Sequence, residues 1–389
     1  MAYISTDLNR FYAALESSYG LVPAPVASSA YRALRANLTL VQDYLERQDK
    51  TGSRSFSGII AGGRRHGGFE VDAYLIPSGA AGVAPNMGPF FQAACGGIPQ
   101  VFGGGQVTAG CTTTSVLFAA PHGLAVGQAI GSGGELRFVT AVPSSTQVTV
   151  NPPFSQAPAA ASDITPTVTY PLGASLPSLA LFDYWDPPSA QQRILCGAAV
   201  DRLEVDVRGD FHQVKFTGQG QDVIDSITFA SGQGGLTSFP LEPGSQALNG
   251  SPLAGHMGQI WLGSPAAKFA TLSNAKLQLE NTVELRGNEF GSHIPLAIVP
   301  GSRKVTLDFD VFEMDDAATS ALYSAAKART SLTAHLQLGS VTGSIFAACL
   351  NSLVPQIPTF DTGEHQLRWS FKGSRAGGVK DDELLVAFG

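Results

Sequence analysis

The chain has 389 residues, of which 44 are glycine and only 14% are charged, and its formal net charge is −7. A hydrophobic content of 44% with this little charge excludes a disordered chain, which needs low hydrophobicity and high net charge. A coiled coil is also excluded, because it would be rich in Glu and Lys. Binding of nucleic acid through its phosphates is not expected, because it needs basic patches and acidic residues outnumber basic ones here. The composition therefore favours a turn-rich, mainly β protein with much of its surface covered by neighbours.

The N-terminal residues and the cysteines indicate the cellular compartment in which the chain folds. The first residues contain neither a basic segment nor an apolar run, and no stretch of 18 apolar residues occurs, so we expect no signal peptide and no membrane-spanning helix. None of the cysteines forms a CxxC pair, which favours small buried residues in a reducing compartment over disulfide or metal partners. They are Cys95, Cys111, Cys196 and Cys349.

The first two predicted elements are a helix over 6–19 and a strand over 33–41. Gly20 suits the end of the helix. Residues 31–45 also fit helical spacing, but Leu38 and its neighbours match a later segment that looks like a strand. This match decides the assignment in favour of a strand.

A hairpin and a short helix follow. The hairpin is expected to turn at Gly62-Gly63, and its second strand alternates apolar and polar residues with period two over 69–74. The helix is predicted over 89–95, because proline suits its first turn and two glycines end it.

Two segments without catalytic motifs interrupt the pattern. Residues 103–172 are nearly free of charge and contain four short strand-like runs separated by Gly and Pro turns, which predicts a small all-β domain inserted into a loop. Residues 226–269 are rich in Gly, Pro and Ser, and we expect a long loop that reaches a neighbouring molecule.

An internal repeat organises the chain. Gly63 and Asp72 match Gly301 and Asp310, 238 positions later, with apolar and acidic residues in register. A second block around His212 recurs 153 positions later. The smaller offset implies that the first copy carries about 85 extra residues, which the insert explains. The second copy is expected to turn at Pro300-Gly301 and to contain a helix over 315–329 and a strand over 367–371.

The repeat predicts a mainly β fold in which two β-sandwich modules, each flanked by a helix, accompany a small inserted all-β domain. The first module takes 1–102 and 173–225, the insert 103–172, the long inter-module loop 226–269, and the second module 270–389.

No reaction centre is expected. The sequence has no GxSxG, HExxH or phosphate-binding loop, so we predict no catalytic residue, no cofactor and no metal. Acidic residues do recur on the polar faces of the predicted strands in both copies. If copies surround an axis, these faces could line a channel that repels DNA phosphates. The candidate channel-lining residues are Glu70, Asp72, Asp308 and Asp310.

Several segments resemble the major tail tube proteins of long-tailed, siphovirus-type bacteriophages. The resemblance rests on the entry segment 14–25, the extended segment 34–40 and the block 54–77 with its Gly-Gly-Arg-Arg turn, which leads into 89–96. It covers most of the chain outside the insert. Two modules in one chain depart from the simplest family pattern.

The resemblance implies a non-enzymatic virion protein that self-assembles into stacked rings, with the inner strands joined in a β-barrel around a channel for DNA. Six modules per ring would need three chains, and a hexamer of whole chains is the alternative. The implied partners are further copies of the chain and the tape-measure, tail terminator and distal tail proteins, while DNA passes without specific binding and no membrane is involved. The implied location is the virion tail, assembled in the host cytoplasm.

Two rival functions stay open at this stage. One is a β-rich binding protein of the virion surface, a tail fibre or capsid decoration that recognises host glycans through the insert. The other is an enzyme whose site is built from distant residues, which a deep pocket with perturbed carboxylates or histidines would support.

Overall fold

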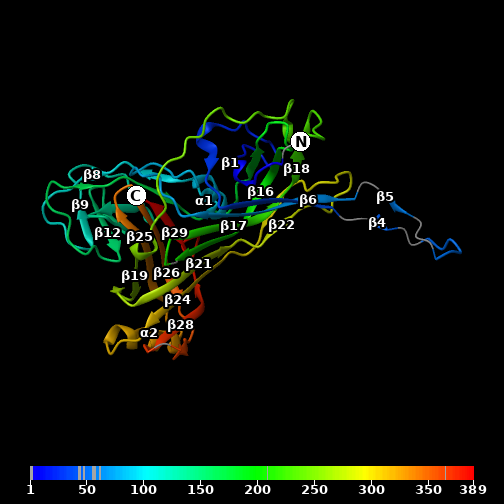
Figure 1. The fold of residues 1–389 in the computed structure, drawn as a ribbon. Helices are drawn as coiled ribbons and strands as arrows, with labels where there is room; N and C mark the ends of the chain where they lie inside the picture. Colours follow the sequence, from blue (N-terminus) through cyan, green and yellow to red (C-terminus); the bar gives the residue numbers. More distant parts are fainter. Residues whose placement is uncertain are drawn as a thin grey trace.

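The computed structural model describes residues 3–42, 45–46, 49–54, 58–60, 63–207, 209–363 and 365–389. The fold is mainly β, with two α-helices among these residues, as the composition predicts. The strands form two modules of the same design, a separate small sheet in the insert, and a hairpin arm that projects from the body at β4 (Leu45–Glu46) and β5 (Ile59–Ile60) (Figure 1).

The first module has two layers of strands. In the outer layer β1 lies between β2 and β15, and β15 continues to β16 and β18. In the inner layer β6 lies between β3 and β17, and β17 pairs with the second half of β16. The long strand β16 therefore belongs to both layers. The bounds are β1 (Asn9–Leu15), β2 (Ala30–Tyr31), β3 (Arg35–Gln42), β6 (Arg65–Tyr74), β15 (Leu179–Trp185), β16 (Arg193–Val207), β17 (Gln213–Gly220) and β18 (Asp222–Asp225).

The second module repeats these pairings in the same order. In the outer layer β19 lies between β20 and β25, and β25 continues to β26 and β29. In the inner layer β24 lies between β21 and β28, and β28 pairs with the end of β26 and with β27. The bounds are β19 (Gly258–Gly263), β20 (Ala266–Phe269), β21 (Leu272–Glu280), β24 (Lys304–Phe312), β25 (Leu332–Val341), β26 (Ser344–Val354), β27 (Thr359–Asp361), β28 (Arg368–Ala376) and β29 (Leu385–Phe388).

The two inner layers form one sheet, because β16 of the first module pairs with β21 of the second. We call this sheet the long sheet; its strand order is β3-β6-β17-β16-β21-β24-β28-β27. The strands of the long sheet from β3 to β28 each turn an apolar face into a single core that spans both modules. The period-two pattern predicted over 69–74 and in the second copy produces this face.

Each module places its helix after the second inner strand. The first helix, α1 (Gly88–Cys95), contributes the buried rings of Phe90 and Phe91 to the common core. The second, α2 (Ala317–Ala328), begins at Asp316, whose side chain accepts a hydrogen bond from the backbone N–H of Thr319. Both helices lie where the sequence predicts them, because proline at the first turn and an acidic N-cap are strong local start signals.

Each outer layer is covered by a different segment. The insert covers the second module, where Phe138 packs against Ile345 and Ala347; the long loop after β18 covers the first. Within the insert, β9, β10, β11 and β12 form one sheet over a small core of their own, at the left in Figure 1. The bounds are β7 (Gln100–Phe102), β8 (Gly105–Gln106), β9 (Ser115–Leu117), β10 (Ala129–Ser132), β11 (Glu135–Ser144), β12 (Gln147–Asn151), β13 (Asp163–Ile164) and β14 (Thr167–Tyr170).

Three sequence predictions of local structure are wrong. Residues 6–19 form a 3-10 turn and strand β1 instead of a helix, because residues 11–13 are buried on both faces between β2 and β15. An apolar run of this kind cannot be assigned by periodicity alone. The last twelve residues of 226–269 contain the strands β19 and β20 instead of a loop, and apolar residues in the rest of that segment pack on the first module.

The second hairpin turn also lies elsewhere. Pro300 ends β23 (Ile298–Pro300), which pairs with β22 (Val283–Leu285), so the second turn spans 286–297. Gly301 follows β23 directly, and a Cβ there would lie 2.7 Å from the carbonyl oxygen of Thr282. In the first copy β4 pairs with β5, and the predicted turn position Gly62 lies outside the described residues.

Candidate functional site

The face of the long sheet that points away from the core is polar. Alternation places one charged or polar side chain at every second position of the inner strands, and these side chains stand next to those of the adjacent strands. We call this surface the polar face.

Ion pairs on the polar face join neighbouring strands. Lys215 on β17 reaches Glu70 on β6, and Arg202 and Lys276 join β16 to β21. Pairs of this kind contribute little stability each when exposed to solvent, but together they set the charge pattern of the surface. The distances are Lys215–Glu70 2.6 Å, Lys276–Glu204 2.9 Å, Arg202–Glu280 3.4 Å, Lys304–Glu280 3.6 Å, Arg35–Glu70 3.8 Å and Lys215–Asp72 3.9 Å.

The four predicted acidic residues all lie on the polar face. Glu70 and Asp72 belong to β6, and Asp308 and Asp310 belong to β24, at the equivalent positions of the second module. The hydrogen bond from Lys215 lowers the pKa of Glu70 and raises that of the lysine. Asp308 accepts a hydrogen bond of 2.6 Å from the backbone N–H of Gly373.

Sequence reasoning missed the basic half of this surface. The acids were seen because they recur along single strands, whereas their partners come from other strands and are set by register. In the first module, for example, β6 places Asp72 opposite both Arg35 and Lys215. The polar face therefore carries mixed charge instead of a purely acidic one.

The pairing of β16 with β21, which we call the seam, joins the last inner strand of one module to the first inner strand of the next. Opposite pairs are Leu203 with Leu279 and Val205 with Leu277, and all four side chains are buried. On the other face Arg202 stands opposite Glu280. The seam thus combines an apolar row with a charged row, as the interior of a sheet does.

The long sheet ends in two strands that correspond to the two sides of the seam. At one end β3 is the counterpart of β21, and at the other β27 is the counterpart of the end of β16. Among the described residues β3 pairs only with β6, and β27 only with β28. The apolar counterparts of seam residues are exposed here: Leu40 is 47% exposed against 0% for Leu279, and Phe360 is 53% exposed against 0% for Val205.

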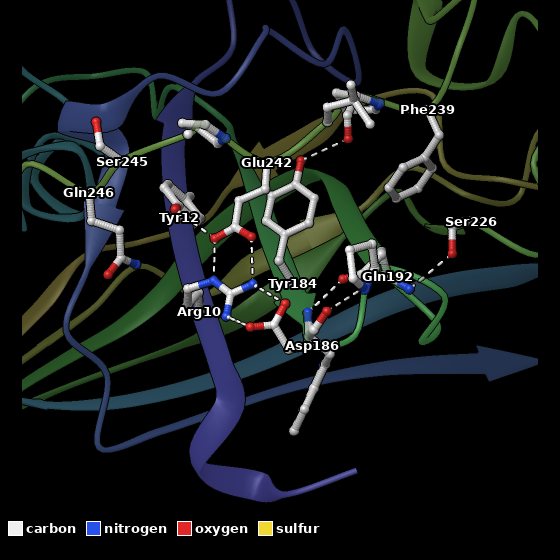
Figure 2. A pocket seen from close by; sticks show the side chains of 16 residues that line it. Arg10, Tyr12, Tyr184, Asp186, Gln192, Ser226, Phe239, Glu242, Ser245 and Gln246 are labelled. Atoms are coloured by element: carbon white, nitrogen blue, oxygen red, sulfur yellow. Dashed lines mark hydrogen bonds and ion pairs between the residues drawn. The ribbon is translucent and has the colours of Figure 1, made fainter. Parts of the chain in front are cut away.

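A cavity of about 760 Å³ lies on the outer layer of the first module under residues 239–246, which we call the strap (Figure 2). Arg10 on β1 points into it between two carboxylates. Its guanidinium binds Asp186 at 2.7 and 3.0 Å and forms a two-armed contact with Glu242 of the strap. Tyr12 donates a hydrogen bond of 2.9 Å to the same Glu242.

This cavity is built to hold the strap. The hydrogen bonds that Arg10 donates to Glu242 and Asp186 raise the pKa of Arg10, and burial together with the Glu242 contact raises the pKa of Tyr12 to about 12. Because two carboxylates already bind the guanidinium of Arg10, this arginine is not free to bind an anionic ligand. Tyr184 adds a hydrogen bond of 3.1 Å to the carbonyl of Pro240.

The insert is joined to the second module through a buried arginine. Arg137 on β11 is fully buried, pairs with Glu135 at 3.0 Å and lies 4.1 Å from the ring of Trp261 on β19. Burial lowers the pKa of Arg137 to about 10, so the guanidinium remains charged at neutral pH. Its further hydrogen bonds go to Gln337 (3.1 Å) and to the carbonyls of Leu136 (2.7 Å) and Pro153 (3.0 Å).

Beneath Arg137 lies a buried histidine. His335 packs edge-on against Trp261 and Phe138, and neither ring nitrogen has a hydrogen-bond partner among the described residues. Burial and the nearby guanidinium hold the pKa of His335 well below its usual value. The first module has Phe182 at the equivalent position, opposite Tyr12 as His335 is opposite Trp261.

In the described part of the chain, no three His, Cys, Asp or Glu side chains come together as a metal site, and neither helix is long and apolar enough to cross a bilayer. The sequence matches no family model, and no curated protein is detectably similar to it.

Proposed function

We propose that the chain is a structural virion protein that self-assembles into stacked rings, and that the rings form the tail tube of a long-tailed bacteriophage. The observation that carries the proposal is the seam. Within one chain it joins two equivalent modules head to tail, and it leaves the same two kinds of edge free at the ends of the long sheet.

Head-to-tail contacts between copies generate either a closed ring or an open filament. Pairing of β27 with β3 of the next copy would repeat the seam and leave no exposed edge, which is how closed sheets avoid aggregation. Transferring the seam register places Phe360 opposite Leu38 and Asp361 opposite Asn37 of the neighbour. Three chains would give six modules around the axis.

Elementary sheet geometry gives the size of such a ring. With a strand spacing of about 4.8 Å and a tilt of about 40°, eight strands from each of three chains give a circumference of about 150 Å and a backbone diameter of about 48 Å. That bore admits a DNA duplex after side chains are added. A ring of six whole chains would be about twice as wide on the same reasoning.

The polar face would line this bore, because the opposite face of the long sheet is buried in the core. Glu70, Asp72, Asp308 and Asp310 would then face the channel, interleaved with basic side chains. A surface whose cations are already held by carboxylates offers few free charges to DNA phosphates, so a duplex could pass without specific binding.

The remaining assignments follow from this role. The partners would be further copies of the chain, within and between rings, and the tape-measure, tail terminator and distal tail proteins, in a virion tail assembled in the host cytoplasm. The insert, on the outer layer of the second module, would lie on the outside of the tube. No catalytic step is proposed.

Electron microscopy of the purified chain tests the proposal. We expect rings or hollow tubes, with class averages down the axis showing three copies and pseudo-sixfold symmetry. A chain that stays monomeric at high concentration overturns it, and six copies per ring would replace the trimer with the hexamer. A Phe360→Lys variant should block ring formation, because it places a charge at the free counterpart of buried Val205.

A further inference from the structure

The segment between the two modules fills a gap in the first one. Leu75 and His212, at the ends of β6 and β17, share one hydrogen bond, from the N–H of Leu75 to the carbonyl of His212 (2.9 Å). The reciprocal bond is missing, because Leu253 inserts there. Its N–H donates to Leu75 and its carbonyl accepts from His212, both at 3.1 Å. The Leu253 side chain is 4% exposed and belongs to the common core.

The second module has the same gap without a filler. The N–H of Glu313 donates to the carbonyl of Leu367 at 2.9 Å. Strand register makes these two residues the counterparts of Leu75 and His212, so the sequence match that placed the second block 153 positions after the first is two residues short. No described residue binds the carbonyl of Glu313 or the N–H of Leu367. The adjacent Met314 is 51% exposed, whereas its counterpart Ile76 is 8% exposed beneath the inter-module segment.

The N-terminal segment is the counterpart of the one that holds Leu253. A 3-10 turn at Gly255–Met257 directly precedes β19, and a 3-10 turn at Thr6–Leu8 directly precedes the equivalent strand β1. This alignment makes Ile4 the counterpart of Leu253. Ile4 is 49% exposed, and among the described residues β3 pairs only with β6, so no further module of the same chain lies beside β3.

We propose that residues 3–8 of one copy dock on the second module of the neighbouring copy, with Ile4 inserted between Glu313 and Leu367. This inference rests on the proposed head-to-tail ring, because that ring places a second module beside β3. Ile4 would then donate its N–H to Glu313, accept from Leu367 and cover Met314, as Leu253 does in the first module. Each subunit contact would then contain backbone hydrogen bonds at Ile4 in addition to the pairing of β27 with β3.

The Ile4→Asp variant tests whether the Ile4 side chain is buried in the subunit contact. Because Ile4 is half-exposed in the single chain, Ile4→Asp should leave the thermal unfolding midpoint of the unassembled protein unchanged. It should raise the concentration needed for ring assembly at least about ten-fold, since a buried aliphatic contact is lost and a charge is left in its place. Val126→Asp, at an exposed position on the insert, is the matched control and should have no effect.

Disulfide cross-linking tests whether Ile4 lies beside Leu367 of the neighbouring copy. In a Cys111→Ser background, where the remaining cysteines are buried, Ile4→Cys with Leu367→Cys should give covalent trimers on oxidation of assembled rings. Ile4→Cys with Val126→Cys should give none. If rings form, yet the first pair does not cross-link and Ile4→Asp assembles normally, the docking inference is overturned while the ring stands. If the unaltered chain forms no rings, the proposed function fails first.

Discussion

Replacing Arg137 with alanine should loosen the insert from the second module. The guanidinium is fully buried at this boundary, where it pairs with Glu135 and lies over the ring of Trp261. Its removal leaves Glu135 without its basic partner and the Trp261 ring without the cation that covers it. Gln337 keeps its hydrogen bond of 3.1 Å from the N–H of Leu136, so the damage is confined to the arginine's own contacts.

The expected loss of stability is about 3 kcal/mol. Removing one partner of a buried ion pair costs about 3–5 kcal/mol, and a desolvated cation over an aromatic ring contributes about 2 kcal/mol, but the two figures describe the same group and do not add. The lower end applies because Glu135 keeps its bonds to the Ser155 hydroxyl (2.6 Å) and N–H (2.8 Å).

Urea denaturation followed by tryptophan fluorescence measures this loss, since Trp261 lies directly under the guanidinium. Lys268→Ala is the matched control: its ammonium lies 5.8 Å from the same ring but is exposed, so the change should cost less than about 1 kcal/mol. Equal losses in the two variants, or a loss below about 1 kcal/mol for Arg137→Ala, would refute the reasoning that the buried arginine joins the insert to the module.

Three further outcomes are expected. Because the pKa of His335 is depressed in the folded chain, unfolded chains bind more protons, and the free energy of unfolding should fall as pH drops below about 6.5. Urea denaturation at pH 7 and pH 5 should show a smaller fall for His335→Phe, which adopts the residue of the first module; an unchanged slope would contradict the assignment. Glu242→Gln should release the strap from Arg10, seen as faster limited proteolysis within 239–246 while the global unfolding midpoint changes little. Replacing Asp72 and Asp310 with lysine should leave ring assembly largely intact but slow DNA ejection from virions; unchanged ejection kinetics would argue against their place in the bore.

Local patterns predicted the strands that are buried on one face only. Residues 69–74 alternate strictly, and 33–41 was assigned correctly because its copy in the second module reads more clearly. The prediction failed for 6–19, where Phe11, Tyr12 and Ala13 are buried in succession. A strand buried on both faces has no alternation, so only its pairing with β2 and β15 distinguishes it from a helix.

Sequence patterns predicted the acidic residues of the polar face but not the basic ones, for a related reason. Glu70 and Asp72 alternate along one strand and can be read from the chain. Their basic neighbours Lys215 and Arg35 lie more than thirty residues away in sequence and come beside them only through strand register. Arg137 is a similar case, since no local signal distinguishes an exposed arginine from one sealed between the insert and a second module.

The sequence by itself determined the duplication and the apolar and polar faces of most inner strands, because both are patterns of residue type along the chain. The tertiary structure decided the rest: that the two modules share the long sheet, that β3 and β27 are its free edges, and that Leu253 fills one of two equivalent gaps. These features depend on which distant strands pair and in which register. A period-two pattern is compatible with many such pairings, and burial of the whole core selects among them.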